Sequence, residues 1–191
     1  MKTLEMKYLN LFALILSLFT GLVLSSCDKE CNESNSLKDP VYFQYEARNY
    51  AWGFYHVGWY IDNKGNFDYY SLPEDLVEPD SSGYISKANL LANLTKADSI
   101  VYNISIHALQ NQVELIDAVD EKKFSEIEHV GADIGIVNLY CYQWDKNRNL
   151  YKRFLLATGG DFIQYNLDPE ARELTAWMIA IGDESGTFSW H

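Results

Sequence analysis

Apolar and polar residues alternate with a period of two along the first part of the chain beyond residue 40, which predicts β-strands. The alternation covers residues 41–46, continues through 49–62 and returns in 67–72. The last two segments are separated by Asp, Asn and Gly residues, which favour a tight turn and hence a β-hairpin. Gly53 and Gly58 interrupt the pattern, as is typical of a bulge or of the close approach of another backbone.

A second hairpin is predicted later in the chain. Residues 134–144 are rich in β-branched and aromatic side chains, and residues 150–157 return after a polar turn. Apolar residues recur at the helical period in three other segments, each with a capping residue at its start. The predicted helices span 86–94, 105–116 and 168–182. These elements predict an α+β fold, with an antiparallel sheet built from two hairpins and about three helices packed on one face.

The chain opens with a positively charged start and an apolar run. Lys2 and Lys7 precede residues 9–24, which are almost wholly apolar, and small residues then precede Cys27. This arrangement predicts a secretory signal. The alternative is an uncleaved membrane-spanning helix, but about 20 apolar residues are needed to cross a bilayer and polar residues interrupt this run.

Residues 24–27, Leu-Ser-Ser-Cys, resemble the lipobox of bacterial lipoproteins. The resemblance implies that the signal peptide of residues 1–26 is removed and that Cys27 carries a lipid anchor. The expected partner is then a membrane, which the anchor binds. Residues 27–40 then form a lipidated flexible tether, because their short polar side chains do not drive folding. A single α+β domain is expected over 41–191.

The residues after the lipobox leave the target membrane open. Asp28 resembles the inner-membrane retention signal of some Gram-negative lineages, whereas the acidic stretch 27–30 resembles an export signal of others. We favour the outer membrane of a Gram-negative cell envelope. The periplasmic and the surface face both remain possible.

Acidic residues outnumber basic ones, with 27 Asp and Glu against 15 Lys and Arg and a net charge of −12. Binding to nucleic acid depends on Lys and Arg contacts to phosphate, so a nucleic-acid partner is not expected. The same charge also promotes solubility, which is its simplest explanation.

Cysteine usage does not indicate a metal or a cofactor. With Cys27 lipidated, Cys31 and Cys141 remain, and they either pair in an oxidising compartment or stay apart, with Cys141 as an inert buried thiol. The sequence holds no CxxC motif, so zinc is not indicated. The charged run 117–129 fits no metal-binding spacing and is interpreted as a solvated face.

Aromatic residues are concentrated near the start of the predicted domain, where residues 42–70 hold 12 of the 28 Phe, Trp and Tyr residues. Most of these rings are expected in the core. Those left exposed would stack on sugars or anchor a protein interface. We single out Trp52, Trp59 and Tyr60 as candidate ligand-binding residues for a glycan or protein ligand.

The segments 45–72 and 155–177 resemble a family of small, uncharacterised bacterial lipoproteins and secreted proteins. The resemblance rests on residues 49–53 (Asn-Tyr-Ala-Trp-Gly), 58–62 (Gly-Trp-Tyr-Ile-Asp), Gly65, Gly160, Asp161, Asn166, Ala171 and Trp177. It implies one compact domain and brings no assigned activity.

No catalytic residue is predicted, because the sequence holds no GxSxG, HExxH or phosphate-loop motif. We therefore expect a cell-envelope lipoprotein that serves as a non-catalytic binding or accessory module. One alternative is an inhibitor or immunity-type protein that offers an acidic face to a basic target. The other is a hydrolase of envelope or dietary polymers, which would need a pair of carboxylates with separated pKa values.

Overall fold

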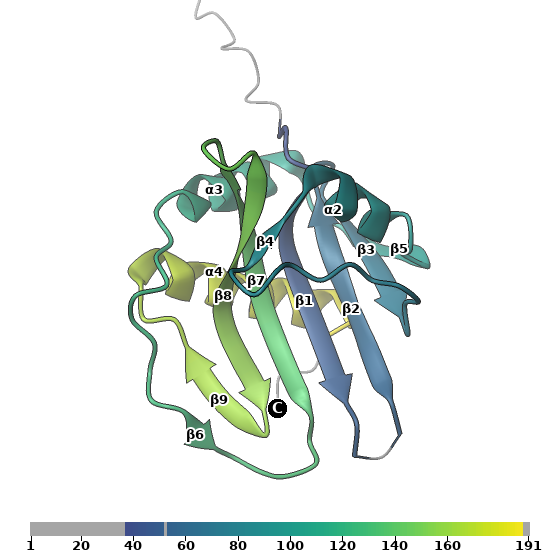
Figure 1. Cartoon of the computed structure of the whole chain (residues 1–191), viewed down its shortest axis with the longest axis vertical. Coiled ribbons are helices and arrows are strands. Elements are labelled where there is room, and N and C mark those ends of the chain that lie inside the picture. Colours follow the sequence, from purple (N-terminus) through teal and green to yellow (C-terminus); the bar gives the residue numbers. More distant parts are fainter. Residues whose placement is uncertain (1–36, 52, 189–191) are drawn as a thin grey trace, which may run out of the picture. The chain divides into compact units, whose positions relative to one another are not determined.

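The computed structural model describes residues 37–51 and 53–188 and has the predicted α+β architecture (Figure 1). The signal peptide, Cys27, Cys31, most of the tether and Trp52 lie outside the described residues. Leu37–His191 forms one compact unit. The described strands are β1 Val41–Asn49, β2 Tyr55–Asp62, β3 Asn66–Ser71, β4 Tyr84–Ile85, β5 Ser99–Asn103, β6 Glu128–His129, β7 Ile136–Asp145, β8 Leu150–Gly160 and β9 Phe162–Tyr165. The helices are α2 Lys87–Leu94, α3 Ile106–Ile116 and α4 Pro169–Ser185.

The strands form one nine-stranded sheet in the order β5-β3-β2-β1-β7-β8-β9-β6, with β4 added beside β8. Both predicted hairpins are present, as β2–β3 and β7–β8. What joins them is β1, which pairs antiparallel with β2 on one side and with β7 on the other. The first strand of the domain is therefore the middle of its sheet.

The predicted strand 49–62 is too long, because β1 ends at Asn49 and β2 begins only at Tyr55. Asn49 accepts a hydrogen bond from the backbone N–H of Ala51 at 2.7 Å, and Gly53 has φ +107°. That side-chain bond and that left-handed backbone make a turn, so β1 and β2 form a third hairpin. We call residues 50, 51 and 53–55 the hairpin tip.

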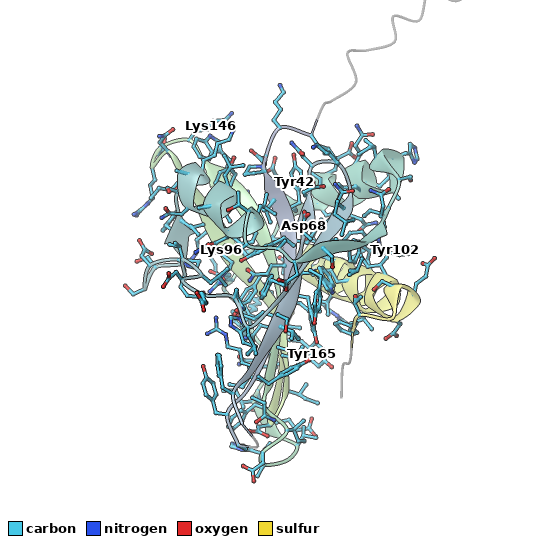
Figure 2. All side chains as sticks on the ribbon, turned by 90° about the vertical axis from the view of Figure 1, so that its right-hand side faces the viewer. Tyr42, Asp68, Lys96, Tyr102, Lys146 and Tyr165 are labelled. Atoms are coloured by element: carbon cyan, nitrogen blue, oxygen red, sulfur yellow. The ribbon has the colours of Figure 1, made fainter. Side chains whose placement is uncertain are left out.

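The helices cover both faces of the sheet, so the prediction that they share one face is wrong. Helices α3 and α4 bury Leu109 and Leu174 in one core, together with Phe43 of β1. Helix α2 buries Leu90 in a second core against Tyr60. Figure 2 shows the sheet nearly edge-on, with α4 on one side and Lys96, which follows α2, on the other.

Three helix caps confirm the sequence signals. The side chains of Ser86, Ser105 and Asp168 each accept a hydrogen bond from a backbone N–H of the first turn of α2, α3 and α4. The predicted end of the last helix at Gly182 is wrong, because α4 runs on to Ser185. Its cap is Gly186, which has the left-handed φ of 67° that such a cap needs.

Gly58 confirms the expected close approach of a second backbone. A Cβ atom added at this position would lie 2.3 Å from the carbonyl oxygen of Tyr45 and 2.4 Å from the hydroxyl of Tyr70. Only glycine leaves room there for the side chain of Tyr70.

Candidate functional site

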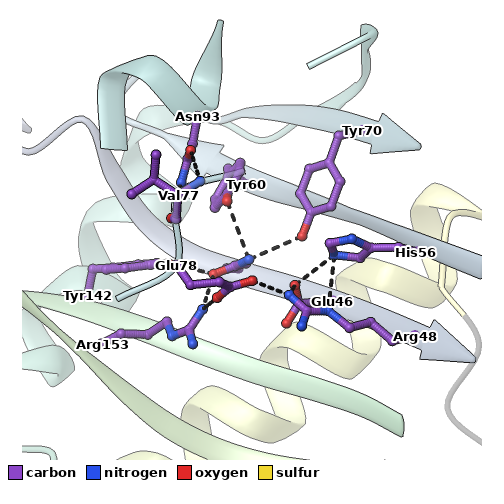
Figure 3. A network of polar contacts seen from close by, with 11 residues as sticks. Glu46, Arg48, His56, Tyr60, Tyr70, Val77, Glu78, Asn93, Tyr142 and Arg153 are labelled. Carbon is purple, nitrogen blue, oxygen red and sulfur yellow. Dashed lines mark hydrogen bonds and ion pairs between the residues drawn. The ribbon is translucent and has the colours of Figure 1, made fainter. Parts of the chain in front are cut away.

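Charged and polar side chains line the face of the sheet that α2 covers. Along β1, Gln44, Glu46 and Arg48 point to this face, because side chains alternate along a strand, while Phe43 and Tyr45 point into the opposite core. Gln44 and Glu46 are almost fully buried, with 1% and 3% exposed. They belong to a polar network whose members lie on β1, β2, β3, β7, β8 and one loop, and Figure 3 shows Glu46 within it.

Glu46 is paired with two basic groups. Its Oε1 lies 2.8 Å from Nε2 of His56, on β2, and 2.6 Å from Nη2 of Arg48, two residues along its own strand. The Nε atom of Arg48 also lies 3.3 Å from the same His56 nitrogen. One nitrogen does not donate to Glu46 and accept from Arg48 at once, so an ionised Glu46 places the imidazole proton on Nε2.

The ionisation of Glu46 follows from these partners. Burial would raise the pKa of its carboxyl, but the hydrogen bond from His56 and the charges of Arg48 and Arg153 outweigh burial and hold the pKa below its ordinary value. Glu46 is therefore a stable carboxylate at neutral pH. It is not poised to give or take a proton.

A loop crosses over this network. We call residues 72–83, which connect β3 to β4, the strap. Glu78 of the strap forms ion pairs with Arg48 and with Arg153 of β8, the latter at 3.2 Å. The neighbouring Val77 is held at both its backbone N–H and its C=O by the side-chain amide of Asn93, at 2.9 and 2.8 Å. The strap is thus fixed to α2 beside the point where Glu78 reaches the sheet.

Gln44 is the second centre of the network. Its amide nitrogen donates to the hydroxyls of Tyr70 and Tyr60 at 3.1 and 3.4 Å, and its carbonyl oxygen accepts from Tyr142 at 2.5 Å. Arg153 Nη1 lies 3.5 Å from that oxygen. Burial raises the pKa of Tyr60 and Tyr70 well above the ordinary range, so both hydroxyls stay protonated and act as hydrogen-bonding groups.

The charged and polar groups of the network are engaged with one another. Its carboxylates, Glu46 and Glu78, both contact arginines, and its tyrosines are held protonated by burial. The described cysteine, Cys141, lies in the opposite core, where burial raises the pKa of its thiol. Among residues 37–51 and 53–188, no group of three or more His, Cys, Asp or Glu side chains is placed to hold a metal ion.

Two of the three predicted ligand-binding residues are buried. Trp59 is 0% exposed and packs against Tyr45 and Phe67, with ring centroids 5.4 and 4.7 Å apart. Tyr60 is 1% exposed and bonds to Gln44. Neither ring offers a face to a ligand in this structure, because each fills one of the two cores.

Exposed aromatic rings gather instead at the hairpin tip. Tyr50, Phe54 and Tyr55 are 70%, 57% and 50% exposed. The ring centroids of Tyr50 and Phe54 lie 5.3 Å apart, and that of Phe54 lies 6.1 Å from the ring of His56. A row of rings therefore runs from the tip to the polar network.

A second loop supports the tip. The side-chain amide of Asn49 donates to the backbone carbonyls of Asp133 and Ile134, both at 3.0 Å. Ile134 and Ile136 are 48% and 43% exposed and extend the apolar surface next to the tip. Strand β1 begins at Val41 and ends at Asn49, and at 3.3 Å per residue it is about 26 Å long. The tip therefore lies at the end of β1 opposite to Val41 (Figure 1).

No family model, curated protein or solved structure matches the chain. The resemblance to small bacterial lipoproteins therefore stays a prediction. Within the part of the chain that the structure describes, no helix has the length and hydropathy to cross a membrane.

Replacing Glu46 with Gln tests the role of its charge. The folded-state pKa of Glu46 is lowered, so its carboxylate stabilises the fold above the ordinary value of 4.5, and this contribution is lost as the pH falls through the folded-state value. We expect Glu46→Gln to lower the free energy of unfolding by about 2 kcal/mol at pH 7, the scale of a hydrogen bond to a charged group. The difference should shrink at pH 3.

Urea unfolding at both pH values measures this effect. Glu74→Gln, the same change at an exposed strap residue, is the control and should stay close to the wild type. A Glu46→Gln variant as stable as the control at pH 7 would show that the buried charge does not hold the network together.

Proposed function

We propose that the protein is a lipoprotein of the Gram-negative cell envelope, anchored through Cys27, that serves as a non-catalytic binding or accessory module. The lipobox-like residues 24–27 support the anchor, and we place it in the outer membrane. The observation that carries the binding role is the exposed aromatic tip of the β1–β2 hairpin.

The position of the tip suits a lipid-anchored binder. The tether leads into β1 at Val41, and the exposed rings of Tyr50, Phe54 and Tyr55 come after the other end of that strand. A chain anchored at its N-terminus thus carries its aromatic surface at the end of the sheet away from the attachment point. Aromatic rings stack on the apolar faces of sugars and also anchor protein interfaces, so the ligand is a glycan or a protein.

The polar network supports a binding role over hydrolysis. A hydrolase of the glycosidase type needs two carboxyl groups, one of which is held protonated at neutral pH. Glu46 has a lowered pKa, and Glu78 is shared between two arginines. Glu46 therefore does not lie in the environment that a general acid requires.

The lipid anchor is tested by metabolic labelling with an alkyne-bearing fatty acid in a Gram-negative host. The full chain should take up the label, and Cys27→Ala should lose it, because the thiol is the site of acylation that the lipobox resemblance implies. Cys31→Ala is the matched control and should keep the label. Labelling retained in Cys27→Ala would contradict the proposed anchor.

The binding role is tested by a thermal-shift screen of the full chain in detergent against glycans, peptidoglycan fragments and basic protein partners. A specific ligand at 100 times its dissociation constant should add about 2.7 kcal/mol to the free energy of unfolding. Phe54→Ala should weaken binding of that ligand at least about tenfold, since truncating a hot-spot residue costs about 2 kcal/mol or more and about 1.4 kcal/mol corresponds to a factor of ten.

Leu91→Ala, at an exposed apolar residue of α2, is the control for the tip variant and should bind as the wild type does. The melting temperature of ligand-free Phe54→Ala should match that of the wild type, because Phe54 is 57% exposed. A ligand that binds Phe54→Ala and the wild type equally would contradict a binding role for the tip.

A further inference from the structure

Two arginines on the polar face share one carboxylate. Arg48 of β1 contacts Oε1 of Glu78 through Nη2, and Arg153 of β8 contacts Oε2 of the same group at 3.2 Å through Nη1. One oxygen therefore serves each guanidinium group, as Figure 3 shows. This spacing is what a carboxylate ligand would need to bridge the two strands.

Both arginines are held in place by groups other than Glu78. Arg48 is bonded to the buried carboxylate of Glu46 at 2.6 Å. The guanidinium group of Arg153 lies over the ring of Tyr140, 4.2 Å from its centroid, and within 3.5 Å of Gln44. The side chains of Arg48 and Arg153 are only 30% and 17% exposed. The pair is therefore preorganised, so that binding an anion requires little ordering.

Glu78 is the weakly held member of the group. Its side chain is 41% exposed, and it comes from the strap, which contains no helix or strand. Ion pairs as exposed as this one contribute little to stability. Asn93 holds the backbone of Val77 directly before it, so release of Glu78 needs only a rotation of its own side chain.

The charges at this place favour an anion when Glu78 turns away. Two guanidinium groups then face the single carboxylate of Glu46, which leaves a surplus of one positive charge beside partly buried arginines. The chain as a whole carries a net charge of −12, so a local surplus of positive charge is opposite in sign to the protein's net charge. A small anionic group of the size of a Glu side chain end would restore the balance.

We propose that Arg48 and Arg153 form a binding site for a carboxylate-bearing ligand, and that Glu78 is an internal occupant which the ligand displaces. The site adjoins the hairpin tip through Arg48, which pairs with His56 across β1 and β2. A ligand that stacks on the tip and carries a carboxylate could reach both. The site does not depend on the role of the tip, and the test below separates the two.

Acetate is the probe, because it reproduces the end of the Glu78 side chain. The full chain in detergent micelles is titrated with sodium acetate against sodium chloride at constant ionic strength, and the Nε–H resonances of Arg48 and Arg153 are followed by NMR. Glu78→Gln should bind acetate about tenfold more tightly than the wild type, because the internal competitor is gone. Both arginine resonances should shift and saturate together.

Matched variants make the result decisive. Glu74→Gln removes the same charge from an exposed part of the strap and should bind acetate as weakly as the wild type. Glu78→Asp keeps the charge but shortens the side chain, so its affinity should fall between those of the wild type and Glu78→Gln. It also supplies the comparison if Glu78→Gln does not fold.

Equal acetate affinities for Glu78→Gln and Glu74→Gln would overturn the proposal, as would arginine resonances that follow ionic strength alone. Phe54→Ala should leave acetate binding unchanged. Loss of glycan or protein binding with intact acetate binding would therefore count against the tip alone, and the reverse result would count against the arginine site alone.

Discussion

The fold is arranged around one buried carboxylate. Glu46 lies near the middle of the central strand with 3% of its surface exposed, and an unpaired charge there would be prohibitive. It is compensated by His56 from the neighbouring strand and Arg48 from its own. Arg48 in turn reaches the strap through Glu78. The pairing of Glu46 therefore determines which side chains fill this face and where the strap crosses it.

The two faces of the sheet are stabilised in different ways. On the side of α3 and α4, rings such as Phe43 and Trp59 form a continuous apolar core. On the side of α2, tyrosine rings supply apolar area while their hydroxyls satisfy Gln44. Buried polar groups stabilise a fold only when every member has a partner. Here the partners come from β2, β3, β7, β8 and the strap, segments far apart in the sequence, so the network links β1 to four other strands of the sheet.

The sequence predicted the elements more reliably than their environment. Periodicity found both hairpins, the capping residues found the starts of three helices, and Gly58 correctly marked a close backbone approach. The polar positions of β1, such as Gln44 and Glu46, have the spacing expected for the solvent-exposed face of a half-buried strand. A period of two shows that the faces differ but not that a later loop covers the polar one, and the strap has no periodic signal of its own. Trp59 was predicted as a ligand contact from the local density of aromatic residues, which does not show which rings are buried, and it lies in the core.

The proposed binding role rests on an aromatic tip at one end of the sheet and on a polar face of paired charges beside it. The most direct measurement is the carboxyl carbon resonance of Glu46, followed by NMR in the full chain from pH 7 to pH 3. The carboxyl should stay ionised as the pH passes its ordinary pKa of 4.5, and should take up a proton only when the network opens. A Glu46 carboxyl that becomes protonated above pH 4.5 while the fold stays intact would contradict the account.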